Sequence, residues 1–101
     1  MGKPSKLARD EVKRRLLLIL DEGMLTYTWH CRHDRMPERG VTTQDVEYVL
    51  ETGAVSEDAE WCSTNQLWKY RIDGTDLEGE DLRAIFVVIE SHLMVRVITI
   101  F

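Results

Sequence analysis

The chain has 101 residues, of which 44% are hydrophobic and 31% are charged, and its formal net charge is −5. This length holds one domain, and this composition excludes disordered and collagen-like chains. The net negative charge argues against a generic polyanion-binding protein. The charge is unevenly distributed, however. Residues 1–15 carry six cations against two anions, or +4, and residues 16–101 carry seven against sixteen, or −9.

Residues 1–23 form a basic segment that we expect to be an extra amphipathic helix. Ser5 is the expected cap, Gly23 ends the helix, and the apolar stripe follows helical spacing at Ala8, Val12, Leu16, Ile19 and Leu20. The apolar run is too short for a signal peptide or a membrane span. We therefore predict a cytoplasmic chain without a membrane association. Its two cysteines, Cys31 and Cys62, are expected to be reduced thiols.

Residues 24–101 are predicted to form a single α+β domain. A short strand over 24–29 is followed by a polar helix over 30–39, which Pro37 interrupts or ends, and by a turn at Gly40. Thr42 and Asp45 have the spacing of a capping box, so they predict a second helix, which ends at Gly53.

Strands dominate the second half of the sequence. The pattern predicts them over 55–61, 67–73, 82–90 and 93–101, with an acidic hairpin loop before residue 82 and a tight turn at 91–92. This order predicts N-terminal helices packed on a four- to five-stranded, mainly antiparallel sheet.

Residues 30–40 hold the densest group of polar side chains, with three arginines and two histidines. Arg32, Arg35 and Arg39 share one helical face if the helix survives Pro37, and guanidinium groups suit phosphate oxygens. A histidine such as His30 transfers protons near neutral pH, so the group could cleave RNA without a metal ion. The structural alternative is a surface helix with Arg–carboxylate pairs.

A metal site is disfavoured, although His30, Cys31, His33 and Asp34 all have ligand chemistry and Cys62 or His92 could join them. Their spacing matches no closed zinc pattern, and the arginines would repel a cation. We expect no metal or other cofactor. Cys31 fits either a low-pKa thiolate or, more commonly for such a residue, a small buried side chain.

The strand over 67–73 offers further substrate contacts. Trp68, Tyr70 and Arg71 could stack on and hold an RNA base. Aromatic residues at strand spacing are more often core residues or cross-strand pairs, so both interpretations stay open.

The motif H-x(4)-R-M-x-E-R-G, at His30 to Gly40, resembles that of a bacterial domain-of-unknown-function family, and the likeness extends over residues 24–101. That family in turn resembles the RelE/ParE-like and BrnT-like toxin superfamily. The resemblance implies a RelE-like toxin sandwich that cleaves RNA without a metal ion and is silenced by an antitoxin. His30, Arg35 and Arg39 match the motif directly.

Two hypotheses follow. In the first, the chain is the ribonuclease of a toxin–antitoxin type system: His30 is the general acid or base, Arg35 and Arg39 hold phosphate, and the supporting substrate contacts come from Tyr70, Arg71, Arg32 and Trp68. In the second, the same fold serves as a non-catalytic interaction module or subunit. Its partner, an antitoxin or another protein, would bind the basic N-terminal helix. The RNA target, the partner and the oligomeric state are left open by the sequence.

Overall fold

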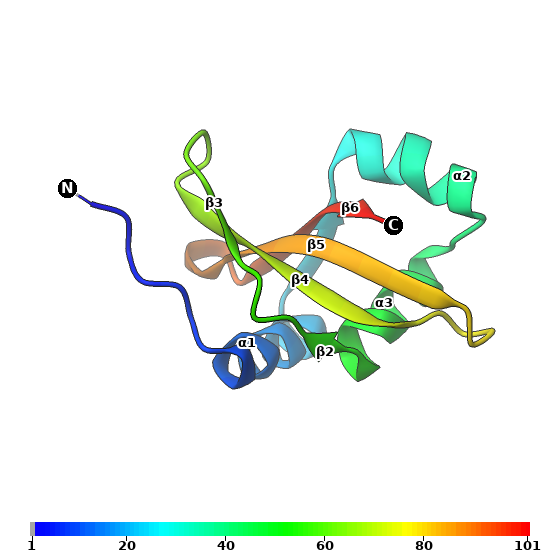
Figure 1. Cartoon of the computed structure of the whole chain (residues 1–101), viewed down its shortest axis with the longest axis horizontal. Helices are drawn as coiled ribbons and strands as arrows, with labels where there is room; N and C mark the ends of the chain where they lie inside the picture. The colour runs from blue at the N-terminus through cyan, green and yellow to red at the C-terminus, as the bar shows by residue number, and fades with distance from the viewer. Residues whose placement is uncertain (1) are drawn as a thin grey trace.

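A six-stranded sheet organises the fold in the computed structural model, which describes residues 2–101 (Figure 1). Met1, the first residue of the predicted segment 1–23, lies outside them. The strands are β1 (Met24–Tyr27), β2 (Ala54–Val55), β3 (Glu60–Cys62), β4 (Leu67–Thr75), β5 (Asp81–Ile89) and β6 (Met94–Ile100). Their order is β1-β6-β5-β4-β2, with β3 paired to β4. All pairs are antiparallel except β1–β6. The predicted α+β class is confirmed, and the strand expected over 55–61 is instead two short strands, β2 and β3.

Helices α1 (Arg9–Glu22) and α3 (Thr43–Thr52) cover one face of the sheet. The predicted stripe of α1 is confirmed where Val12, Leu16 and Ile19 are buried. The helix begins four residues after Ser5, so the predicted cap is wrong; its first turn follows Ala8 without a side-chain cap among residues 2–101. Tertiary contacts hold the preceding segment extended instead. The backbone N–H of Leu7 donates to the Tyr70 hydroxyl (3.1 Å), and Trp68 Nε1 donates to the carbonyl of Pro4 (2.9 Å).

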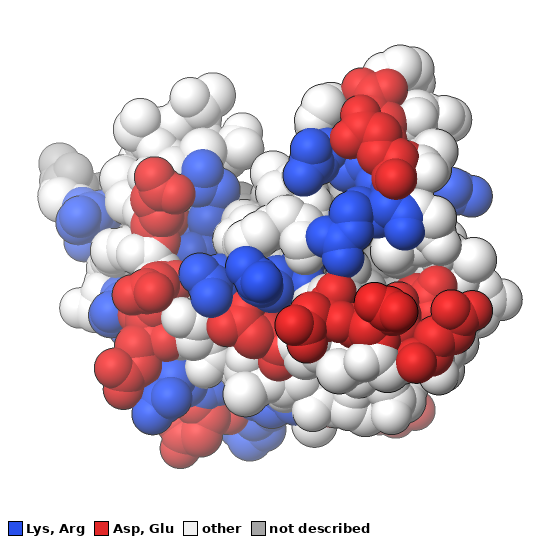
Figure 2. Space-filling model, turned by 45° about the vertical axis from the view of Figure 1, so that its right-hand side comes forward, with Lys and Arg blue, Asp and Glu red and all other residues white. Residues whose placement is uncertain are grey.

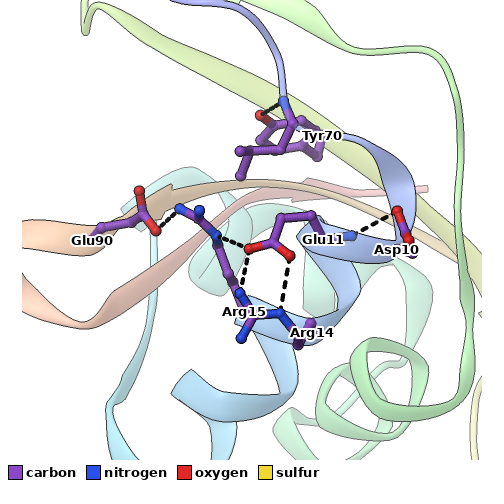
Figure 3. Close-up of polar contacts among 7 residues, drawn as sticks. Asp10, Glu11, Arg14, Arg15, Tyr70 and Glu90 are labelled. Carbon is purple, nitrogen blue, oxygen red and sulfur yellow. Dashed lines mark hydrogen bonds and ion pairs between the residues drawn. The ribbon is translucent and has the colours of Figure 1, made fainter.

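Two of the six N-terminal cations, Arg9 and Arg15, pair with carboxylates of the acidic remainder of the chain, Glu57 and Glu90. Lys13 Nζ donates to the carbonyls of Leu50 (2.9 Å) and Gly53 (2.8 Å) at the end of α3. Arg15 bridges Glu11 on its own helix to Glu90 in η2 (Glu90–His92), the short turn between β5 and β6 (Figure 3). Part of the positive charge of residues 1–15 is therefore paired within the molecule.

Residues 29–39, called the motif helix below, are helical without a break, so the interruption expected at Pro37 does not occur. The helix widens to a π-helical turn, η1 (Cys31–Arg35), and continues as α2 (Met36–Arg39). Pro37 has no N–H to donate, and its ring crowds the preceding turn. The wider turn accommodates it, with the N–H of Met36 donating to the carbonyl of Cys31. As predicted, Gly40 ends the helix in the left-handed region, at φ 64°.

The predicted capping box of α3 is also confirmed. The Thr42 side chain accepts from the backbone N–H of Asp45, and the Asp45 carboxylate accepts from the backbone N–H of Thr42. Of residues 2–101, none belongs to a helix long and apolar enough to cross a membrane.

The second face of the sheet, called the open face below, lies opposite α1 and α3. Side chains alternate between the two faces of a strand, so the neighbours of the buried Tyr70, Ile72, Ala84 and Phe86 point to the open face. The motif helix and the β3–β4 end rise on this side of the sheet in Figure 1. The open-face side chains of β4 to β6 and the following residue include Lys69, Arg71, Asp73, Arg83, Ile85, Thr99 and Phe101.

Candidate functional site

Two guanidinium groups meet beside one aromatic ring on the open face. The guanidinium carbons of Arg71 and Arg83 lie 5.7 and 5.3 Å from the centroid of the Phe101 ring. Arg71 Nε and Nη2 donate to the two carboxylate oxygens of Asp73 (2.7 and 3.0 Å), and Asp73 faces Arg83 in the strand register. Arg71 therefore lowers the pKa of the Asp73 carboxyl. Asp73 thus lies between two cations, and the nearby Asp58 also acts on the charge of Arg71.

Figure 2 shows a hollow between two raised parts of the surface on this side of the molecule. Basic side chains gather in it, and a belt of acidic side chains lies below it. A net-negative chain thus presents a cationic surface. At physiological ionic strength, charges beyond about 8 Å are largely screened, so the local cluster dominates what a nearby phosphate senses.

Arg35 and Arg39 attach the motif helix to the ends of the central strands. Arg35 Nε and Nη2 donate to the carbonyl of Ile100 (both 3.3 Å), and Arg39 Nη2 donates to the carbonyl of Asp81 (2.9 Å). Ile100 directly precedes Phe101, so Arg35 lies at the border of the open face. These carbonyl contacts, and the pair of Arg35 Nη1 with Glu38 Oε2 (3.4 Å), agree with the structural alternative that the sequence left open for the arginines. The Arg35 side chain is 35% exposed.

His30 pairs with a carboxylate on the exposed side of the motif helix. Its Nδ1 lies 2.9 Å from Asp34 Oδ2, and the His30 side chain is 64% exposed. A carboxylate on one ring nitrogen orients the imidazole and leaves the other nitrogen to exchange a proton. Next to this pair, the rings of Trp29 and His33 stack at 4.8 Å. His30 and Asp34 thus form an accessible acid–base pair about one helical turn before Arg35.

Tyr70 and Trp68 lie on the helix-covered face and are not brought together with Arg71. Tyr70 is 5% exposed, and its hydroxyl accepts from Leu7 (Figure 3). Trp68 packs edge-on against Trp61 with their ring centroids 5.5 Å apart. The alternation of a strand separates these two residues from Arg71, and that signal was available in the sequence. We retain only Arg71 for the site.

Among residues 2–101, Arg32 shares no hydrogen bond or ion pair with Arg35 or Arg39, and Cys31 is a core residue on whose thiol the charges of Arg35 and Arg32 act. Burial is the main cause that raises the pKa of Tyr27 to about 12, and the positive charge of Arg32 opposes that rise. Cys31 is fully buried, which raises the pKa of its thiol. It is a small core residue and not a reactive thiolate.

The residues that the sequence interpretation missed are Lys69 and Phe101, and Phe101 carries no pattern of its own. Arg83 lies on a strand that the sequence predicts to be largely buried, so a carboxylate partner or a ligand was expected for it, although it was not assigned to the site. Among residues 2–101, no three His, Cys, Asp or Glu side chains are grouped to hold a metal ion.

A larger hollow, of about 630 Å³, lies elsewhere, between the start of α1 and β2. Glu57 already pairs there with Arg9 (3.2 Å), and its carbonyl accepts from Lys6 (3.2 Å). None of its lining residues within 2–101 belongs to the motif helix or carries a guanidinium group beside Phe101, so we place the candidate site on the open face.

Comparison with known proteins gives one match. A family model described as "Domain of unknown function (DUF4258)" matches residues 27–101, from β1 to the end of the described chain, and leaves α1 outside the matched range. No curated protein and no solved structure matches the chain.

Proposed function

The chain belongs to the DUF4258 family, and from the site described above we propose that it is a toxin-like ribonuclease domain that cleaves RNA without a metal ion. The observation that carries this proposal is the position of the His30–Asp34 pair on a helix anchored, through Arg35, beside the guanidinium groups of the open face.

In the proposed reaction, the RNA backbone lies on the open face. His30 takes the proton of a ribose 2′-hydroxyl, whose oxygen bonds to phosphorus while the bond from phosphorus to the 5′-oxygen breaks. The departing oxygen takes a proton from water, and the products are a 2′,3′-cyclic phosphate and a 5′-hydroxyl. Arg71 and Arg83, with the exposed part of Arg35, stabilise the added negative charge on the phosphorane.

The test is RNA cleavage by the purified chain in EDTA. The His30→Ala variant should lose cleavage by about a hundredfold or more, because a positioned proton-transfer group contributes about that much. His92→Ala is the matched control, since His92 is also exposed but lies in the η2 turn. Equal cleavage rates for the wild type and both variants, or no cleavage by a folded wild type, would contradict the proposal.

A second candidate function, a non-catalytic interaction module, is favoured by α1. Leu17 and Leu18 are both 42% exposed on this helix, and three of its four cations pair with carboxylates within the molecule. Adjacent exposed leucines are typical of a protein contact more than of nucleic-acid binding. In this function the partner, an antitoxin or a larger complex, binds apolar side chains of α1.

Co-expression with the product of the neighbouring reading frame tests this candidate. A stable complex that Leu17→Ser and Leu18→Ser together disrupt, from a chain that leaves RNA intact, would support it. A chain that cleaves RNA and forms no complex would leave only the ribonuclease.

A further inference from the structure

A small pocket adjoins the guanidinium cluster at the β3 side of the open face. Its volume is about 340 Å³, near the lower end of the ~300–1,000 Å³ range of small-ligand sites. Ala59, Ile85 and Phe101 supply its apolar lining. Because two of these side chains come from β5 and the residue after β6, the pocket is continuous with the surface proposed to hold the RNA backbone.

The polar lining of this pocket has two chemically different parts. Lys69 and Arg71 supply cations from β4, and Asp58 and Glu60 supply carboxylates from the segment that forms β3. Arg71 is fixed by its bidentate contact with Asp73, so a planar guanidinium is held at the pocket wall. Lys69 Nζ lies 3.7 Å from Glu60 Oε2, a loose pair whose carboxylate is 80% exposed.

These features correspond to the parts of one nucleotide. Unpaired RNA bases stack on aromatic side chains and guanidinium planes and are read along their Watson–Crick edges. The cations suit the phosphate. The carboxylates accept hydrogen bonds, and guanine is the RNA base whose Watson–Crick edge presents two adjacent donors, N1–H and N2–H.

We propose that this pocket binds a guanine base of single-stranded RNA, with its Watson–Crick edge toward Asp58 and Glu60 and its phosphate toward Arg83 beside Phe101. This inference rests on the proposed function, because it names the base that the ribonuclease selects. In this inference, Asp58 and Glu60 select the base, a role that simple charge pairing with the nearby cations would not give them.

Binding of free nucleotides tests the inference separately from cleavage. The wild type is titrated with 5′-GMP, 5′-AMP, 5′-CMP and 5′-UMP, and the amide resonances of Lys69, Arg71 and Ile85 are followed by NMR. We expect 5′-GMP to bind about tenfold tighter than the other three, the discrimination typical of a bidentate base contact.

The double variant Asp58→Asn, Glu60→Gln separates base recognition from electrostatics. Removing two negative charges beside Lys69 and Arg71 should strengthen binding of all four nucleotides equally if only phosphate is recognised. If guanine is recognised, the variant should lose the roughly tenfold preference for 5′-GMP. Glu78→Gln, in the β4–β5 loop, is the control for a lost carboxylate and should keep the preference.

Equal affinities for the four nucleotides in the wild type, or a preference for 5′-GMP that survives the double variant, would overturn the inference. The ribonuclease proposal would stand in that case if the His30 variant still fails to cleave. Selective 5′-GMP binding by a chain without cleavage activity would leave the pocket assigned and the ribonuclease refuted.

Discussion

The left-handed backbone conformation of Gly40 ends the motif helix and allows the chain to turn toward α3. Its φ of 64° places it in the left-handed region. A methyl group on its Cα would meet no heavy atom of residues 2–101 within 4 Å, apart from those of its chain neighbours. Any cost of a side chain here is therefore backbone strain and not a clash.

We predict that Gly40→Ala lowers the free energy of unfolding by about 1–2 kcal/mol, the cost of a left-handed conformation for an L-residue. Gly40→Asn should cost less, since asparagine tolerates this region. Urea unfolding followed by circular dichroism measures both. Wild-type stability for the alanine variant would show that the turn relaxes to another conformation.

The two cysteines should differ in reactivity. Cys31 is fully buried with a raised thiol pKa, whereas Cys62, in β3, is partly exposed. Since the thiolate is the reactive form, native protein treated with iodoacetamide at pH 8 should be modified at Cys62 well before Cys31. Peptide mass spectrometry gives the two rates. The two cysteines should be modified at comparable rates only in denaturant. Comparable modification rates in the native protein would contradict the buried position of Cys31.

At the scale of elements, α3 was predictable because all its signals are local. Thr42, Asp45 and Gly53 mark its ends, and its stripe of Val46, Val49 and Leu50 is buried. The start of α1 was not predictable, because contacts of the preceding segment with Trp68 and Tyr70, more than sixty residues away, keep Ser5 extended. Likewise, the sequence predicted that Pro37 interrupts or ends the motif helix, because no local pattern indicates the π-helical turn that lets the helix continue to Arg39.

The capping box of α3 should contribute measurably to stability. We predict that Thr42→Ala costs about 1 kcal/mol of unfolding free energy, the typical value for losing a cap. Hydrogen bonds from the backbone N–H groups of Thr42 and Leu77 lower the pKa of the Asp45 carboxyl. Because the folded-state pKa lies below the ordinary value of 3.8, the stabilisation by Asp45 is present above that pH. It is lost as pH falls through the folded-state pKa.

Asp45→Asn should therefore reduce the unfolding free energy at pH 7, and the difference from wild type should shrink as pH falls below about 4. Asp21→Asn, near the end of α1, controls for the loss of one negative charge. Urea unfolding at several pH values gives the comparison. A difference that stays constant down to pH 2 would mean that the carboxylate charge of Asp45 contributes nothing.

At the scale of the whole molecule, α1 is part of the core and not an appendage. Val12, Leu16 and Ile19 belong to the same buried cluster as residues of α3 and the central strands. Burying each of these side chains contributes about 1.5–3 kcal/mol. Their sum is comparable with the whole stability of a typical domain, about 5–15 kcal/mol.

We predict that a chain of residues 23–101 does not fold cooperatively on its own, although the family match begins only at residue 27. Circular dichroism and thermal unfolding of this truncated chain provide the measurement. A sharp transition with native-like spectra would show that residues 24–101 are an independent unit, as the sequence division into 1–23 and 24–101 implies. The candidate site is harder to predict from the sequence than the fold. Its side chains come from several strands, and no local sequence pattern indicates which strands lie next to each other in the sheet.

The parallel pairing of β1 with β6 also sets when this protein can fold during its synthesis. Met24 lies opposite Met94, and the register continues to Tyr27 and Val97. A parallel pair needs a long connection, and here that connection is most of the domain. On the ribosome, β1 would leave the exit tunnel long before its partner strand is translated. Until then, the apolar face of α1 that is buried in the folded protein would remain exposed to solvent. We expect nascent chains stalled before β6 to remain sensitive to protease, and those stalled with β6 outside the tunnel to become resistant.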